Sequence, residues 1–320
     1  MRREEGGMRI KDIGEIKLIE RISKGIKLDA SVIKGIGDDT AVIAWPGPVT
    51  ARGNGNRSKY LLYTCDMLVE DIHFRLSRAT PFQIGWKAMA RNLSDIAAMG
   101  GVGRYAVISI GVDPEKSLSF VDGIYKGIKA VCGKFKVNIV GGDVSRSKKT
   151  VIDISLIGEV EKRKLVTRSG AKEGDLILVT GSFGGSIKRK HLNFTPRINE
   201  ARQLVNNFKI NSMIDVTDGL ILDLSRILEA SRVGARIHQS LIPISGEAES
   251  FKRSIIDGED FELLFTISAN EARRFFRTGF AKMKTPVTLI GEVTGKRDGF
   301  ILVTDDAKEK KIRPEGYLHF

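Results

Sequence analysis

Cysteine and histidine are scarce in this sequence of 320 residues, which contains only two cysteines and four histidines. Cys65 and Cys132 cannot form a disulfide framework, and no spacing typical of zinc or haem attachment is present. The sequence therefore predicts a protein of a reducing compartment, the cytoplasm, with a structural role as the default for both cysteines.

Long apolar runs are also missing. No segment approaches the length of a membrane-spanning helix, and no apolar stretch follows the first five residues, so we expect no membrane anchor or signal peptide. The common nucleotide signatures GxxxxGK[ST] and GxGxxG are absent, as are the protein-kinase motifs and GxSxG. Residues 181–186 (GSFGGS) are rich in glycine but lack the lysine of a phosphate-binding loop. An ATP-dependent enzyme with this sequence would need an uncommon fold.

Basic residues outnumber acidic ones, with 52 Lys and Arg against 39 Asp and Glu and a net charge of +13. They are spread along the chain and accompany no zinc-finger, basic-leucine or aromatic-interleaved pattern, so we expect no nucleic-acid partner. Anionic small-molecule substrates or a solvated basic surface explain the charge equally well. A nucleic-acid-binding protein remains a remote alternative, which predicts tight and steeply salt-dependent binding.

The segment 80–101 has the pattern of a helix around which the chain is organised. Thr80 is a suitable N-cap, Pro81 fits the first helical position, and apolar residues from Phe82 to Ile96 recur every three or four residues. Further helices are expected at 16–22 and 114–135, strands at 60–66 and 137–140, and a loop at 45–59. Strands alternate with helices in both halves, which predicts an α/β fold with α+β layers and a boundary near residue 160.

A set of aspartates is expected where a strand or helix ends and meets a glycine, serine or threonine turn, in both halves of the chain: Asp38, Asp39, Asp66, Asp71, Asp95, Asp143, Asp215 and Asp218. Any one of them alone is most often a turn or capping residue. If they converge, however, their charges require a counter-charge, and hard oxygen ligands favour Mg²⁺ or Ca²⁺. Mg²⁺ bound by carboxylates and nucleotide phosphates indicates phosphoryl transfer.

Several motifs occur in an order that resembles one known family. They are 35–41 (GIGDDTA), 64–74 (TCDMLVEDIHF), 92–100 (NLSDIAAMG), 141–143 (GGD), 167–171 (TRSGA), 215–220 (DVTDGL) and 258–263 (GEDFEL). Each motif is weak alone, but together they closely resemble the thiamine-monophosphate kinase family, of the aminoimidazole ribonucleotide synthetase superfamily. The resemblance runs from about residue 16 to the C-terminus.

The resemblance implies an N-terminal domain (1–160) that binds ATP and Mg²⁺ and whose strands form a β-barrel across a homodimer, followed by a C-terminal α+β domain (161–320). It implies transfer of phosphate from ATP to thiamine monophosphate, giving thiamine diphosphate, with several Mg²⁺ ions. We expect direct in-line transfer, because the attacking phosphate oxygen is already ionised and needs no strong base. The alternative is a superfamily enzyme with another phosphate acceptor.

The resemblance also implies roles for individual residues. The Mg²⁺ ligands would be Asp39, Thr64, Cys65, Asp66, Asp95, Asp143, Asp215 and Asp218. Of these, Asp66, Asp95 and Asp143 would be catalytic. ATP would contact Tyr125, Gly142, Asp143, Arg168 and Thr217, and thiamine monophosphate would contact His73, Glu259 and Tyr317.

Some of these assignments have structural alternatives or depart from the family pattern. His73 could be a core histidine, Arg168 a surface ion pair and Glu259 a turn residue. Cys65 stands where many relatives carry Ser or Thr, so only its backbone carbonyl is a suitable ligand. Tyr317 lies in a region where the family often places a Trp near the substrate ring.

Overall fold

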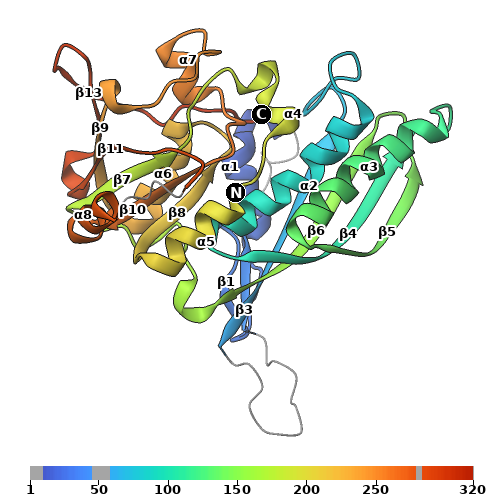
Figure 1. The fold of residues 1–320 in the computed structure, drawn as a ribbon, viewed down its shortest axis with the longest axis horizontal. Coiled ribbons are helices and arrows are strands. Elements are labelled where there is room, and N and C mark those ends of the chain that lie inside the picture. Colours follow the sequence, from blue (N-terminus) through green and yellow to red (C-terminus); the bar gives the residue numbers. More distant parts are fainter. Residues whose placement is uncertain (1–9, 45–57, 279–282, 320) are drawn as a thin grey trace, which may run out of the picture.

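Two β-sheets, one in each half of the chain, form the framework of the protein (Figure 1). The computed structural model describes residues 10–44, 58–278 and 283–319. The expected loop at 45–59 lies almost entirely outside these residues. In the described part of the chain, no helix combines the length and apolar character that crossing a bilayer requires.

The N-terminal half contains a six-stranded sheet in the order β1-β2-β3-β6-β4-β5. Its pairs are antiparallel except β4 with β5, which are parallel because helix α3 crosses over between them. The elements are α1 (Ile10–Ser23), β1 (Val32–Lys34), β2 (Ala41–Ala44), β3 (Lys59–Val69), α2 (Pro81–Ala98), β4 (Val102–Val112), α3 (Leu118–Phe135), β5 (Asn138–Arg146) and β6 (Val151–Glu161).

Two strands run further than the sequence predicts. β3 does not end at Asp66 but continues to Val69, paired with β6 along its whole length. β5 continues through the predicted turn at Gly141 and Gly142, because it stays paired with β4 as far as Arg146. Asp66 and Asp143 therefore lie inside strands, and the expectation that they stand at strand ends is wrong.

Helix α2 matches its sequence signals closely. Thr80 and Gln83 form a reciprocal capping box, and Pro81 begins the helix. Met89, Leu93 and Ile96 are fully buried, whereas Phe82 at the start of the apolar stripe remains 36% exposed. α2 contacts β3, β6 and α3 in its own half and α5 and β8 in the other half. This helix therefore joins the two halves of the molecule.

The helices α2 and α3 lie side by side on the sheet (Figure 1) and approach unusually closely. A Cβ atom at Gly85 would sit 1.9 Å from the carbonyl oxygen of Ile124, and one at Gly127 would sit 2.0 Å from that of Phe82. Only glycine allows this contact. α3 begins at Leu118 after the N-cap Ser117, four positions later than the predicted start at Pro114.

The C-terminal half contains a seven-stranded sheet in the order β13-β12-β9-β11-β7-β10-β8. Its strands are β7 (Asp175–Thr180), β8 (Ile210–Val216), β9 (Gly234–His238), β10 (Glu262–Ser268), β11 (Val287–Thr294), β12 (Phe300–Val303) and β13 (Glu309–Lys311). Its helices are α4 (Lys190–Asn193), α5 (Ile198–Asn207), α6 (Leu220–Ser231), α7 (Phe251–Ile256) and α8 (Ala269–Arg277), with short 3₁₀ helices η2 (Lys162–Lys164), η3 (Ser186–Lys188), η4 (Gln239–Leu241) and η6 (Lys296–Asp298).

The main hydrophobic core is continuous between the halves. It includes Leu93 and Ile154 from the first half together with Leu204, Met213 and Phe265 from the second. A second core lies within the C-terminal half, where α6 packs on its sheet. The shared core fixes the two halves against each other, so a site between them has a defined geometry.

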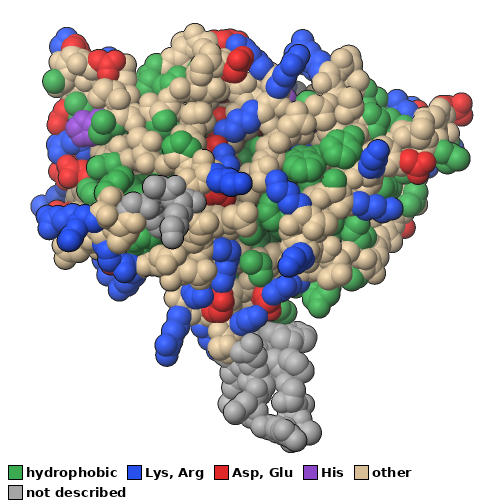
Figure 2. Space-filling view, in the orientation of Figure 1, with side chains coloured by type: hydrophobic (Ala, Val, Ile, Leu, Met, Phe, Trp, Pro, Cys, Tyr) green, Lys and Arg blue, Asp and Glu red, His purple; other side chains and the backbone are tan. Residues whose placement is uncertain are grey.

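In the described chain the six-stranded sheet is open, with β1 and β5 at its edges. Alternating side chains on its strands are exposed although they are apolar, namely Tyr63, Met67, Tyr105 and Val107. A barrel formed across two copies therefore remains a prediction. Lys and Arg side chains lie scattered over the face that Figure 2 shows and do not form one continuous stripe.

Candidate active site

Four of the predicted metal ligands come together where the two halves meet. Asp39 precedes β2, Asp66 lies in β3, Asp95 lies in the last turn of α2, and Asp215 is near the end of β8. Asp95 thus lies in the helix predicted over residues 80–101, near its end. The fold unites these residues because α2 packs against both β3 and β8.

The carboxylates are close enough to affect one another's ionisation. Burial first, and then the charges of Asp66 and Asp215, raise the pKa of Asp95 well above its ordinary value. Burial and the charge of Asp39 likewise raise the pKa of Asp215. The Thr64 hydroxyl donates a 2.5 Å hydrogen bond to Asp95 Oδ2, which places this predicted ligand in the same group. These residues form the carboxylate cluster: Asp39, Thr64, Asp66, Asp95 and Asp215.

Two arginines neutralise part of this charge. Arg168 Nη2 lies 2.6 Å from Asp39 Oδ1, so Arg168 reaches the cluster rather than forming a separate surface pair. Arg91 Nε lies 3.4 Å from Asp66 Oδ2, a contact that the sequence did not predict. Placing the predicted ATP contact Arg168 beside Asp39 agrees with a site for a phosphate and its counter-ions.

The donor set of the cluster suits a hard divalent cation. In the described residues, Asp39 Oδ2 and Asp215 Oδ2 are buried without a hydrogen-bond partner, which is costly unless another positive group reaches them. Carboxylate and hydroxyl oxygens are the ligands that Mg²⁺ prefers. No three His, Cys, Asp or Glu side chains within the described ranges already lie close enough to hold a metal ion. The oxygen donors of the cluster nevertheless fit Mg²⁺ in their chemistry.

The Cys65 side chain points away from this cluster. Its Sγ lies 3.1 Å from Asp153 Oδ1, and the residue is exposed like its alternate neighbours Tyr63 and Met67. Thr64, one residue earlier, faces Asp95 instead. Since successive side chains of a strand point to opposite faces, the thiol cannot join the Asp95 group, and only the Cys65 backbone remains a candidate ligand.

Asp143 and Gly142 are not brought to the cluster of the same chain. The ladder pairs Met67 with Asp153, Asp153 with Ser109, and Ser109 with Asp143. Three strand spacings, about 14 Å in total, therefore separate Asp143 from the Asp66 region. Asp143 is exposed and receives a 3.2 Å hydrogen bond from Ser145. Tyr125 also lies elsewhere, half-buried on α3 against the main core.

The turn at Thr217 and Asp218 is held by a charged network that the sequence did not reveal. Asp223, fully buried in the first turn of α6, accepts hydrogen bonds of 2.9 Å from the backbone N–H groups of Thr217 and Asp218. Arg226 Nη2 lies 2.6 Å from Asp218 Oδ2. Burial raises the pKa of Asp223 to about 7. This network fixes the turn between the carboxylate cluster and the adjacent cavity.

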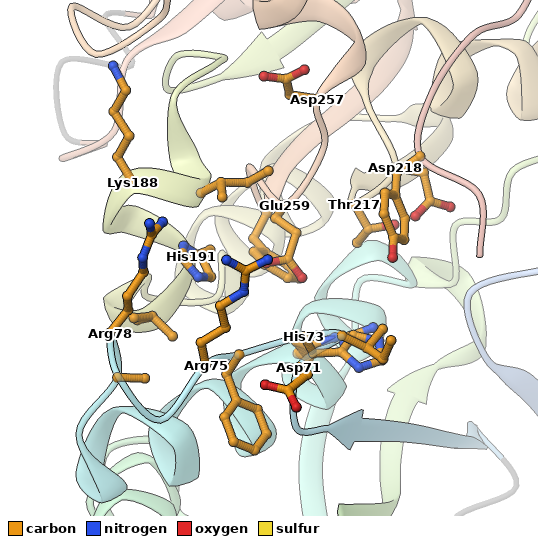
Figure 3. Close-up of a pocket in the computed structure, with 18 of the residues that line it drawn as sticks. Asp71, His73, Arg75, Arg78, Lys188, His191, Thr217, Asp218, Asp257 and Glu259 are labelled. Atoms are coloured by element: carbon orange, nitrogen blue, oxygen red, sulfur yellow. The ribbon is translucent and has the colours of Figure 1, made fainter. Parts of the chain in front are cut away.

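A cavity of about 280 Å³ opens beside this turn (Figure 3). All three residues predicted to contact the substrate line it, His73, Glu259 and Tyr317, together with His319, Thr217 and Asp218. Figure 3 shows His73 and Asp71 on one side, facing Glu259, Thr217 and Asp218 on the other. The fold therefore unites residues that the sequence separates by more than two hundred positions, from His73 to Tyr317.

The wall of the cavity combines a carboxylate with a neutral imidazole. Burial, followed by the charges of Arg91 and Lys87, lowers the pKa of His73 to about 4. Burial alone would favour the neutral form of Glu259, but Lys87 and Arg91 lower its pKa. The fully buried Lys87 was not predicted, because an isolated lysine in a helix usually lies at the surface.

The comparison with known proteins agrees with this arrangement. The family model "AIR synthase related protein, N-terminal domain" matches residues 37–160, and the corresponding C-terminal domain model matches residues 161–304. The thiamine-monophosphate kinase of Rhodopirellula baltica is 37% identical over 299 residues, covering 90% of this chain and 92% of the relative. The Bacillus subtilis enzyme of the same name is 32% identical, covering 96% and 99% respectively.

The chain belongs to the thiamine-monophosphate kinase family. A solved structure described as "AaThiL complexed with AMPPCP and TMP" is 31% identical and superposes with a TM-score of 0.81, covering 98% of this chain and 99% of the other. The matches extend across both halves of the family fold, so the carboxylate cluster and the cavity both lie within the part of the chain that the family shares.

Proposed function

We propose that the protein transfers the γ-phosphate of ATP to thiamine monophosphate, giving thiamine diphosphate and ADP. One observation carries this proposal: a carboxylate cluster suited to Mg²⁺ lies next to a cavity lined by His73, Glu259 and Tyr317. The relatives that share the fold are thiamine-monophosphate kinases, and one related structure was solved with AMPPCP and TMP. The biosynthetic role is consistent with a cytoplasmic location.

In this proposal the carboxylate cluster holds Mg²⁺ and the cavity holds thiamine monophosphate. Bound Mg²⁺ would neutralise the phosphates and orient the transferred group. Arg168 and the Thr217 turn contact the nucleotide, and Asp218, oriented by Arg226, lies at the boundary with the cavity. Glu259 and His73 bind the heterocycle of thiamine monophosphate. The phosphate oxygen of thiamine monophosphate attacks the γ-phosphorus of ATP in line. Positioning and charge neutralisation supply the acceleration.

We further propose that the protein is a homodimer in which the partner copy completes each site. The distance of about 14 Å across the sheet prevents Asp143 from sharing a metal ion with Asp66 of its own chain. Pairing of the open edges of two sheets would form the predicted barrel and bury the exposed Tyr63, Met67, Tyr105 and Val107. It would also carry β5, with Gly142 and Asp143, to the other copy.

The division into domains at residues 1–160 and 161–320 is also part of the proposal. It is supported by the boundary between the two family models, which match residues 37–160 and 161–304.

The experiment that tests the activity measures ADP and thiamine diphosphate together, with Mg²⁺ and with a chelator. We expect both products in equal amounts, and only when Mg²⁺ is present. Formation of ADP without thiamine diphosphate would contradict the proposed acceptor. Equal product formation in the chelator would contradict the metal requirement.

A further inference from the structure

A lysine without any solvent exposure lies beneath the substrate cavity. Lys87 is in the middle of α2, and its Nζ donates hydrogen bonds to the His73 carbonyl oxygen at 2.7 Å and to Glu259 Oε2 at 2.5 Å. Burying an ammonium group is unfavourable unless charged and polar partners compensate it. One cation thus contacts two of the three residues predicted to bind the substrate, His73 and Glu259.

The geometry points to Lys87 as a positioning residue that holds Glu259 and His73 in place for thiamine monophosphate. This inference rests on the proposed function and adds to it a residue that does not itself touch the substrate. Lys87 comes from the N-terminal half and Glu259 from the loop before β10, so the pair bridges the two sides of the cavity.

Glu259 needs such an anchor because its backbone is strained. Its φ angle is 57°, in the left-handed region that residues other than glycine seldom adopt. The backbone N–H of Glu259 donates a 2.6 Å hydrogen bond to the Thr217 carbonyl oxygen, which holds the main chain. Lys87 holds the side chain through Oε2, and the carboxylate still lines the cavity. The carboxylate is therefore fixed in the position from which it can accept a substrate N–H.

The charge state of the pair suits the proposed ligand. Lys87 helps to keep Glu259 ionised, and His73 beside it is neutral because its pKa is lowered to about 4. An anionic carboxylate next to a neutral imidazole matches a ring system that donates N–H groups and carries a positive charge. The aminopyrimidine and thiazolium rings of thiamine have these properties.

The test compares Lys87→Met and Glu259→Gln with their double variant by steady-state kinetics. We expect Lys87→Met to raise the KM for thiamine monophosphate at least tenfold, with kcat within threefold and the KM for ATP within twofold of wild type. The double variant should have a KM within twofold of the worse single variant, because both changes remove the same interaction. A purely structural lysine would give additive effects and alter both KM values.

Lys190→Met is the matched control. Lys190 also binds one carboxylate and one carbonyl oxygen, Glu262 Oε1 at 2.8 Å and the Ser182 carbonyl at 3.2 Å, but it does not line the cavity. We expect its KM for thiamine monophosphate to equal that of wild type. An unchanged KM in folded Lys87→Met protein would overturn the positioning role, as would a parallel rise in both KM values.

A measurement on the unmodified protein keeps the inference testable if Lys87→Met does not fold. Burial lowers the pKa of Lys87 to about 8, although Glu259 opposes this shift. The other charged or titratable groups facing it are Arg91, Asp66, His73 and His191. The pKa values of His73 and His191 are lowered from 6.5 and that of Arg91 is raised, so Lys87 is the group expected to lose a proton between pH 7 and 9.

The KM for thiamine monophosphate should therefore rise at least threefold between pH 7 and 9, while the KM for ATP stays constant. Glu259→Gln should abolish the pH effect, and a pH-independent KM would overturn the role of Lys87. Wild-type protein that forms no thiamine diphosphate would overturn the proposed function together with this inference. Activity with normal Lys87→Met kinetics would overturn the inference alone.

Discussion

Folding and cation binding favour different protonation states of Asp95. Burial and the charges of Asp66 and Asp215 disfavour its ionised form, yet that form is the one that binds a cation. The pKa of Asp95 is raised in the folded state. Protonated Asp95 therefore contributes fully to the stability of the folded protein below the ordinary pKa of 3.8, and this contribution is lost as the pH rises through the raised pKa. Ionisation of Asp95 in the metal-free protein is therefore unfavourable.

We predict that Asp95→Asn raises the melting temperature in chelator by a few degrees and lowers turnover about a hundredfold or more, as removal of one preorganised electrostatic group does in other enzymes. Added Mg²⁺ should stabilise wild type more than the variant. The measurements are thermal unfolding with and without Mg²⁺ and the thiamine diphosphate assay. Asp122→Asn, on the exposed side of α3, is the control and should change neither the melting temperature nor the turnover. Near-native turnover in folded Asp95→Asn protein would rule out the metal role.

At the scale of residues, the sequence identified the groups that stand in motifs. Asp39, Asp95, His73 and Glu259 were found through their resemblance to a family, and the structure brings them to one region. Lys87 and Asp223 were missed, because burial of an isolated charged residue depends on tertiary packing that composition and spacing do not encode. The same reason explains why the contact between Arg91 and Asp66 was not predicted.

At the scale of elements, a charged clamp joins α5 to the end of β6. Arg202 donates 2.8 Å hydrogen bonds to both carboxylate oxygens of Glu161 and a 2.7 Å bond to the Gly100 carbonyl oxygen, which follows α2. The hydrogen bond from Arg202 is the main cause that lowers the pKa of Glu161 to about 2. Because this pKa is depressed in the folded state, ionised Glu161 stabilises the folded protein above the ordinary pKa of 4.5, and this stabilisation is lost as the pH falls towards 2.

We predict that Glu161→Gln lowers the melting temperature at pH 7 by a few degrees, and that the difference from wild type shrinks between pH 4.5 and 2. The pH dependence of thermal unfolding measures this effect. Glu292→Gln is the control, because Glu292 forms only a longer, more exposed pair with Arg236 at 3.5 Å. A difference between wild type and Glu161→Gln that is independent of pH would contradict the role of the ion pair.

The elements most accurately predicted are those whose signals are local. α2 has its capping box, proline and apolar stripe in one segment. The course of β5 was misjudged, because two glycines suggest a turn while the partner strand β4 keeps the backbone extended. Strand pairing between distant segments is not encoded locally, so strand ends are harder to predict than helix starts.

At the scale of the whole molecule, the alternation of strands and helices correctly indicated two α/β halves. The joining of these halves through α2 and a shared core could not be predicted, because it depends on which helix face meets which sheet. The distance of Asp143 from the carboxylate cluster could not be predicted for a similar reason. A motif in the sequence shows that a carboxylate is present, but the number of strands between it and its expected partners depends on sheet order.

The separation of Asp143 from the carboxylate cluster leads to a prediction about assembly. If the partner copy supplies Asp143, mixing Asp95→Asn and Asp143→Asn subunits creates heterodimers with one doubly altered site and one intact site. Random exchange of subunits should then restore about a quarter of wild-type activity from two inactive variants, since half the dimers are mixed and each has one working site. Asp95→Asn mixed with Asp39→Asn is the control and should restore nothing, because both residues belong to the cluster of a single chain. Failure of the first mixture to regain activity, despite subunit exchange verified by mass spectrometry, would place Asp143 outside the site of the partner.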